Sequence, residues 1–147
     1  MMKAVILMPL NGYESLCEKQ AKMIVSRDNG TSREHRAENV DRSWVTHYRV
    51  DGNVITAGNK CDYLLLNEDK KVAYLIELKG ADLVVAARQL AATADRLSTR
   101  LSSYSLQYRI VASKCKTQEI ESSEFKRYRM KWKRSLQYKT NILEEKI

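Results

Sequence analysis

The chain has 147 residues, of which 44% are hydrophobic and 30% are charged, with one proline, five glycines and a formal net charge of +8. This composition predicts a single globular domain over residues 1–147, large enough to form a core without disulfides or structural metals. The apolar run AVILMPL near the N-terminus is too short for a membrane span, and the three separated cysteines show no metal-binding or disulfide spacing. We therefore expect reduced thiols in a cytoplasmic protein with no membrane partner.

The first predicted element is a helix over residues 15–25, because Ser15 and Glu18 have the spacing of a capping box. The polar segment 31–42 is ambiguous and is predicted to be a loop, with a helical turn within it as an alternative. Residues 44–56 carry β-favouring side chains on both sides of Asp51-Gly52, which indicates a hairpin or a tight bend.

Two continuous apolar runs, DYLLL (62–66) and VAYLIEL (72–78), are predicted to be central strands of a covered sheet, paired as an antiparallel hairpin. After Gly80 the apolar residues recur at helical intervals, which predicts an amphipathic helix over 82–101 with Leu90 facing the sheet. Another strand is predicted at 107–113. A strand–helix–strand unit of this kind is expected to be right-handed with parallel strands.

The C-terminal region, about 122–147, is predicted to be a basic amphipathic helical segment. Phe125, Tyr128, Trp132 and Leu136 fall on one helical face, which is expected to pack on the core. Residues 107–147 hold 11 basic and 5 acidic residues, and this excess favours a nucleic-acid partner, with a solvated basic face as the alternative. The outward-facing residues predicted to contact phosphates are Lys126, Arg127, Lys131 and Arg134.

These elements give the order α-β-β-β-α-β-α, an α/β fold in which helices flank a mixed central sheet. Within it, Glu77 and Lys79 interrupt an apolar strand, although burying an unpaired charge is costly. The two residues share one face of the strand, and hairpin pairing brings Asp62 level with Glu77. Two carboxylates and an ammonium group therefore converge at one edge of the sheet.

Such a group suits phosphodiester hydrolysis. Carboxylate oxygens of Asp62 and Glu77, with the backbone carbonyl of Leu78, are ligands that Mg²⁺ or Mn²⁺ accepts. A bound ion polarises the phosphate and lowers the pKa of its water, while Lys79 orients that water or stabilises the charge on the phosphate. We therefore expect Asp62, Glu77 and Lys79 to be catalytic.

Asp62 followed by Glu77-Leu78-Lys79 across a hairpin, then by a helix and a strand, resembles the PD-(D/E)xK nuclease superfamily. Restriction endonucleases and archaeal Holliday-junction resolvases belong to it. The resemblance covers roughly residues 13–113 and implies a restriction-endonuclease-like core, Mg²⁺-dependent cleavage of nucleic acid, with DNA the first expectation, and a possible homodimer. Cys61 stands where family members have proline, a change that removes no ligand.

The resemblance implies two further residues. Many members take an acidic ligand from the first helix, where Glu18 is the best-placed candidate and Glu14 the second, although Glu18 also suits a capping role. Gln89 lies where some relatives place a glutamine near the site, with packing as the alternative. Thr93 stands where the exonuclease-type pattern has a tyrosine.

A structural explanation of the central residues remains open. Glu77 and Lys79 can form an ion pair at a strand end, and Asp62 can be a turn or cap residue. The rival function is accordingly a nuclease-fold module that no longer cleaves and instead binds nucleic acid or a protein partner.

Overall fold

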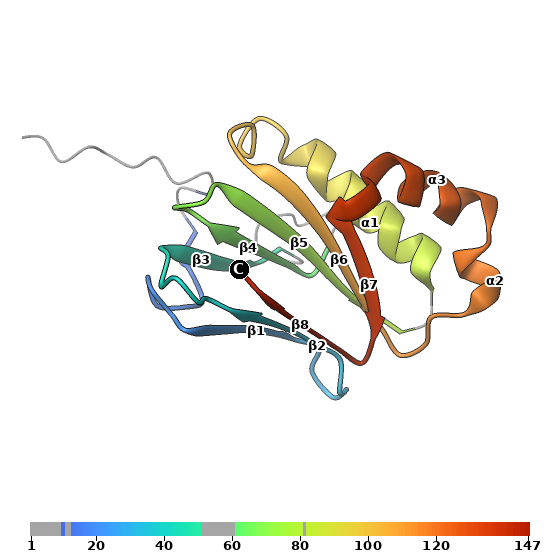
Figure 1. The fold of residues 1–147 in the computed structure, drawn as a ribbon, viewed down its shortest axis with the longest axis horizontal. Coiled ribbons are helices and arrows are strands. Elements are labelled where there is room, and N and C mark those ends of the chain that lie inside the picture. Colours follow the sequence, from blue (N-terminus) through green and yellow to red (C-terminus); the bar gives the residue numbers. More distant parts are fainter. Residues whose placement is uncertain (1–9, 11–12, 51–60, 81) are drawn as a thin grey trace, which may run out of the picture.

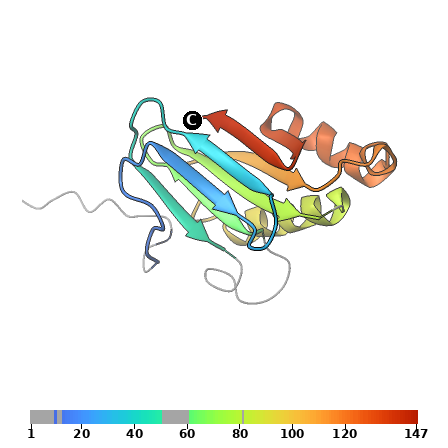
Figure 2. The same cartoon turned by 90° about the horizontal axis from the view of Figure 1, so that it is seen from below.

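The computed structural model describes residues 10, 13–50, 61–80 and 82–147. Two helices cover one face of a five-stranded sheet, and a three-stranded sheet packs on its other face (Figures 1 and 2). The five-stranded sheet has the order β3-β4-β5-β6-β7 and the smaller one the order β1-β2-β8. The elements are β1 (Met23–Arg27), β2 (Glu34–Glu38), β3 (Val45–Arg49), β4 (Tyr63–Asn67), β5 (Val72–Lys79), α1 (Leu83–Arg96), β6 (Ser105–Ala112), α2 (Thr117–Ile120), α3 (Ser123–Trp132), a 3-10 turn (Lys133–Ser135), β7 (Leu136–Thr140) and β8 (Ile142–Lys146).

Strands β4 and β5 form the predicted antiparallel hairpin at the centre of the larger sheet. Alternate residues of the hairpin enter two separate cores. Leu64 and Leu75 belong to the core beneath the helices, whereas Leu65 and Ile76 belong to the core between the two sheets. Because both faces are covered, both strands read as continuous apolar runs.

The predicted strand–helix–strand unit is also present. Helix α1 leads from β5 to β6, and these two strands are parallel. Asp82 caps the helix by accepting a hydrogen bond from the amide of Val85 at 3.0 Å. Leu83 and Leu90 of the apolar stripe are fully buried against the sheet. The helix ends at Arg96, and Leu97 and Leu101 complete the buried stripe from the turn that follows.

The predicted first helix, residues 15–25, is wrong. Met23–Arg27 is strand β1, and the residues before it run along the outer edge of β3. There the amide of Leu16 donates to the carbonyl of His47, and the amide of Val45 donates to that of Lys19. The Ser15 hydroxyl accepts hydrogen bonds from the amides of Cys17 and His47. These bonds to a neighbouring strand replace the capping box that the spacing suggested.

The C-terminal segment is helical only over Ser123–Trp132, so the prediction of a helical segment to 147 is wrong beyond the 3-10 turn. The chain continues as β7, which pairs in parallel with β6, and as β8. Leu136 is buried, but from a strand rather than from the predicted helical face. The class remains α/β with mixed sheets, whereas the element order differs from α-β-β-β-α-β-α.

The polar segment 31–42, predicted to be a loop, contains strand β2. It pairs antiparallel with β1 and parallel with β8, which comes from the other end of the chain. A polar cluster is buried between the sheets: the Glu145 carboxylate accepts bonds from Arg109 Nε at 2.7 Å and Nη2 at 3.0 Å, and lies 2.7 Å from His35 Nε2.

The bend predicted at Asp51-Gly52 lies outside the described residues. Among the helices of the described part of the chain, none is long and apolar enough to cross a membrane.

Leu90→Ala tests the packing of α1. The Leu90 side chain is fully buried between the helix and the sheet, so its truncation should reduce the free energy of unfolding by about 2–5 kcal/mol. Asp95→Ala, an exposed change on the same helix, should alter it by less than about 0.5 kcal/mol. Urea unfolding of both variants measures the difference, and a silent Leu90→Ala would contradict this packing.

Glu145→Gln tests the cluster between the sheets. Burial raises the pKa of Glu145, but hydrogen bonds from His35 and Arg109 outweigh it and lower the pKa to about 2 from an ordinary 4.5. A carboxylate with a depressed pKa stabilises the fold above its unfolded pKa, and this stability is lost as pH falls. The wild type should therefore lose stability between about pH 4.5 and pH 2, and the variant should lose less.

Glu144→Gln is the matched control, because Glu144 is the exposed neighbour on the same strand. Its unfolding free energy should follow the pH dependence of the wild type. Burial and the charge of His35 lower the pKa of His47 to about 4 from 6.5. All three proteins should therefore share a loss of stability as the pH falls from about 6.5 to about 4. Equal acid sensitivity of Glu145→Gln and the wild type would contradict the assignment.

Candidate functional site

The candidate site lies where the β4–β5 hairpin opens, at the end of the central strand. The register pairs Tyr63 with Ile76, so Asp62 lies directly across from Glu77. The backbone of Asp62 is held on both sides: its amide donates to the Ile76 carbonyl at 3.1 Å, and its carbonyl accepts the amide of Val50 at 2.9 Å. This position is therefore part of the sheet rather than of a loose loop.

The Asp62 carboxylate faces along the hairpin toward β5. Its Oδ2 atom accepts the backbone amide of Leu78 at 2.8 Å. Because the amide and carbonyl of one strand residue point to the same neighbour, the Leu78 carbonyl is directed to this side as well. The side chain of Glu77 is only 3% exposed and shares the helix-covered face of β5 with Leu75.

Both carboxylates act on one buried neighbour. Burial raises the pKa of the Cys61 thiol far above its ordinary value, and the negative charges of Glu77 and Asp62 act in the same direction. The thiol is therefore neutral and unsuited to nucleophilic chemistry. The side chains of Glu77 and Asp62 therefore both lie near this thiol.

Helix α1 reaches the site through Thr93, a residue to which the sequence assigned no role. The Thr93 hydroxyl accepts the amide of Cys61 at 2.7 Å and donates to the carbonyl of Gln89 at 2.9 Å. Gln89 lies one turn earlier, on the same side of the helix. Its Oε1 atom is buried and has no hydrogen-bond partner among the described residues. Thr93 thus sets the distance between α1 and the start of β4.

The backbone of Lys79 pairs with Ala112, and its side chain lies outside the described part of the structure. A second cation that the sequence did not indicate, Arg33, comes from the connection between β1 and β2, just before β2 begins. Its Nη1 donates to Ser113 Oγ at 2.5 Å, and the amide of Ser113 donates to the Gly80 carbonyl. Arg33 also pairs with Asp28, which partly offsets its charge.

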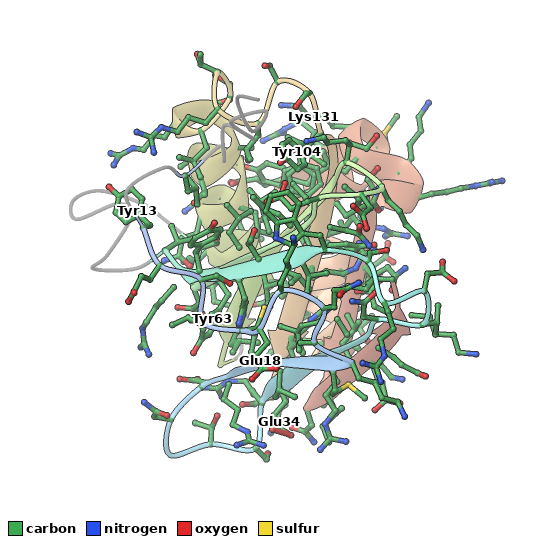
Figure 3. All side chains as sticks on the ribbon, turned by 90° about the vertical axis from the view of Figure 1, so that its left-hand side faces the viewer. Tyr13, Glu18, Glu34, Tyr63, Tyr104 and Lys131 are labelled. Atoms are coloured by element: carbon green, nitrogen blue, oxygen red, sulfur yellow. The ribbon has the colours of Figure 1, made fainter. Side chains whose placement is uncertain are left out.

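Glu18, the acidic residue that the family resemblance implied, is not brought to this site. It lies in an exposed turn (Figure 3). The next residue, Lys19, bonds to Val45, which is at the far end of β3 from Asp62. Four residue steps of β3 already separate those ends by about 13 Å. Glu14 is likewise exposed on the segment that leads into this turn. Within the described residues, no three His, Cys, Asp or Glu side chains gather as a metal site.

Helix α3 presents three faces. Phe125 and Trp132 are buried, and the Trp132 ring stacks on Tyr108 at 4.0 Å between centroids, so the predicted aromatic face packs on the core. The four predicted phosphate contacts, Lys126, Arg127, Lys131 and Arg134, are all exposed. They do not share a face, because Lys126 lies about 100° around the helix from Arg127.

Comparison with known proteins found no match to a family model, to a curated protein or to a solved structure.

Asp62→Ala and Asp62→Asn separate the structural role of this residue from its charge. The alanine variant leaves the Leu78 amide without its acceptor, so it should destabilise the metal-free protein by about 1–3 kcal/mol. The asparagine variant retains a carbonyl oxygen and should cost distinctly less. Denaturant unfolding in EDTA measures both, and equal costs would contradict a structural role for the bond.

Proposed function

We propose that this chain is a divalent-metal-dependent nuclease that hydrolyses phosphodiester bonds of nucleic acid, with DNA as the first substrate to test. Its catalytic residues are Asp62, Glu77 and Lys79. The observation that carries the proposal is the β4–β5 register, which sets Asp62 across from Glu77 at the end of a strand covered on both faces. A metal ion and a phosphate would offset the cost of holding these charges there.

The donor set suits a hard cation. Carboxylate oxygens of Asp62 and Glu77 and the carbonyl of Leu78 are ligands that Mg²⁺ and Mn²⁺ prefer. When bound, the metal supplies a polarised phosphate and a water of lowered pKa. The amide of Leu78 orients the Asp62 carboxylate, as a second coordination shell does.

The cations at the end of β5 have a distinct role in this proposal. Lys79 orients the attacking water or stabilises the negative charge that develops on the phosphate oxygens. Arg33 stands beyond it, bonded to Ser113 next to Gly80. A positive charge at this position also favours binding of the phosphate itself. Asp62 and Glu77 therefore hold the metal, whereas the basic residues act on the substrate.

A second candidate function is a module that retains the fold but no longer cleaves, and that binds nucleic acid or a protein. Two observations favour it: the Leu78 amide already bonds one Asp62 oxygen, and Glu18 lies at the far end of β3. In that case the carboxylates have structural roles alone. The two functions differ in their response to metal, which a catalytic site requires and a structural one does not.

Three substitutions test the nuclease proposal: Asp62→Asn, Glu77→Gln and Lys79→Ala. The two carboxylate variants should lose both the Mg²⁺-dependent rise in melting temperature and cleavage. Lys79→Ala should keep the metal response but lose cleavage by a factor of about 10²–10³, because one group that stabilises the transition state is gone. The measurements are melting curves with and without Mg²⁺ or Mn²⁺, and cleavage of single-stranded, duplex and junction DNA and of RNA.

Asp95→Asn, an exposed charge change on α1, is the control and should behave as the wild type in both assays. The nuclease proposal would be wrong if neither metal changed the melting temperature of the wild type and the wild type cleaved none of the substrates. The non-cleaving module would then be the function. Loss of metal response in Lys79→Ala would place Lys79 in the structural role of an ion-pair partner.

A further inference from the structure

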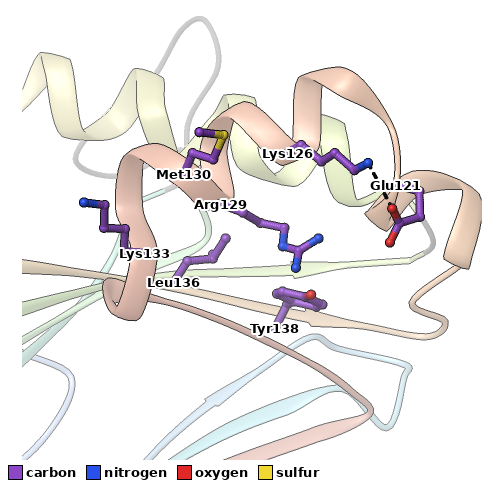
Figure 4. Close-up of a pocket in the computed structure, with 7 residues that line it drawn as sticks. All are labelled: Glu121, Lys126, Arg129, Met130, Lys133, Leu136 and Tyr138. Atoms are coloured by element: carbon purple, nitrogen blue, oxygen red, sulfur yellow. Dashed lines mark ion pairs between the residues drawn. The ribbon is translucent and has the colours of Figure 1, made fainter.

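A pocket of about 670 Å³ lies between α3, the 3-10 turn and β7 (Figure 4). This volume is within the range of about 300–1,000 Å³ typical of ligand sites. The pocket is lined by Glu121, Lys126, Arg129, Met130, Lys133, Leu136 and Tyr138. It is therefore built from the only part of the sequence with a strong excess of positive charge.

The helical period explains why these side chains meet. Lys126, Arg129 and Met130 step by three and one residues, so they form one stripe along α3, and Lys133 continues the lining from the 3-10 turn. Arg127 and Lys131 lie about 100° away on α3, and with the exposed Arg134 of the 3-10 turn they form the second stripe. The pocket thus draws its cations from one of two basic stripes, and only Lys126 belongs to the set predicted from the sequence.

The charges that line the pocket are three cations and one carboxylate. Lys126 Nζ lies 3.1 Å from Glu121 Oε2, and both side chains are about half exposed, so this ion pair is weak and readily exchanged for another anion. Arg129 extends from α3 toward Tyr138 (Figure 4). From Lys126 to Lys133 the cations span about 10 Å of chain at the helical rise.

The pocket also contains apolar and aromatic surface. Tyr138 projects from β7, and the buried Phe125 supports its ring edge-on, with centroids 5.3 Å apart and planes at 83°. Met130 is 74% exposed, although it is a large apolar side chain. A row of cations beside a supported aromatic ring is the combination with which proteins bind single-stranded nucleic acid.

We infer that this pocket binds a single strand of nucleic acid, with backbone phosphates at Lys126, Arg129 and Lys133 and a base against Tyr138 and Met130. The inference rests on the proposed function for the class of ligand. Position supports it: Tyr138 is level with Ile110, and Ile110 is level with Glu77. The pocket therefore lies two strand spacings, about 10 Å, from the candidate catalytic end of β5.

Two triple variants with the same change in charge test the inference. One replaces the pocket cations (Lys126→Gln, Arg129→Gln, Lys133→Gln), and the other replaces the second stripe (Arg127→Gln, Lys131→Gln, Arg134→Gln). The probe is a fluorescein-labelled 12-nucleotide oligothymidylate in EDTA, titrated at salt concentrations from about 50 to 200 mM. The use of EDTA separates binding from cleavage.

Three phosphate contacts to a single strand contribute a salt slope of about −2, which is about a 15-fold loss of affinity over this fourfold change in salt. The pocket variant should lose this contribution and bind more than tenfold more weakly at 50 mM salt, while the second-stripe variant changes affinity by less than about threefold. Glu121→Gln should tighten binding severalfold, because it removes the negative charge beside Lys126. An abasic strand of the same length should bind more weakly than oligothymidylate to the wild type, and Tyr138→Leu should remove that difference.

Equal weakening by the two triple variants would show that the overall positive charge binds the strand, and would overturn the inference, as would a wild type that does not bind the probe. All replaced cations are exposed, so both triple variants should keep the wild-type melting temperature. Failure of the inference is distinct from failure of the proposed function. Asp62→Asn should bind the strand in EDTA like the wild type, and it should fail to cleave the strand when Mg²⁺ replaces the EDTA. Cleavage that survives in the pocket variant with unchanged binding would refute the pocket and leave the catalytic site standing.

Discussion

The burial of β5 on both faces is the constraint on which the rest of the structure depends. Helices α1 and α3 cover one face of the larger sheet, and the β1-β2-β8 sheet covers the other (Figure 1). A strand in that position must be apolar along its length, and ionised groups are tolerated only at its ends. Glu77 and Lys79 fall in the last three residues of β5, and Asp62 precedes the first residue of β4. The covered hairpin therefore concentrates the charged groups at one end.

The elements that the sequence predicts correctly are those whose contacts join residues close together in the sequence. The hairpin and α1 follow from patterns within a few residues, and counting from the turn was enough to align Asp62 with Glu77. Strand β7 could not be found in this way, because Trp132 and Leu136 also have helical spacing. The helix ends where Lys133 adopts a positive φ of 50°, and β7 then pairs with β6, which lies more than 20 residues earlier. Nothing in the local pattern signals that distant pairing.

Strand β2 and the missing first helix illustrate the same limit. Residues 34–38 are mostly polar, and His35 is buried only because β8 brings Glu145 beside it, where Arg109 of the larger sheet completes the cluster. Buried polar residues need hydrogen-bond partners, and a cluster whose three members come from three distant segments cannot be read from a window of sequence. The position of Glu18 could not be predicted for the same reason, since it depended on a helix that the edge of β3 replaces. Thr93 and Arg33 reach the site through contacts that only the folded chain makes.

The balance of charge at the end of the hairpin bears on what the site does. A structural ion pair needs one carboxylate for one ammonium group, and Glu77 with Lys79 would be sufficient. Asp62 adds a second carboxylate directly across from the first. The Leu78 amide bonds one oxygen of Asp62 and so orients the carboxylate. Arg33, nearby, is already paired with Asp28. In the proposed function, a bound cation would relieve the mutual repulsion of the two carboxylates that the register sets across from each other.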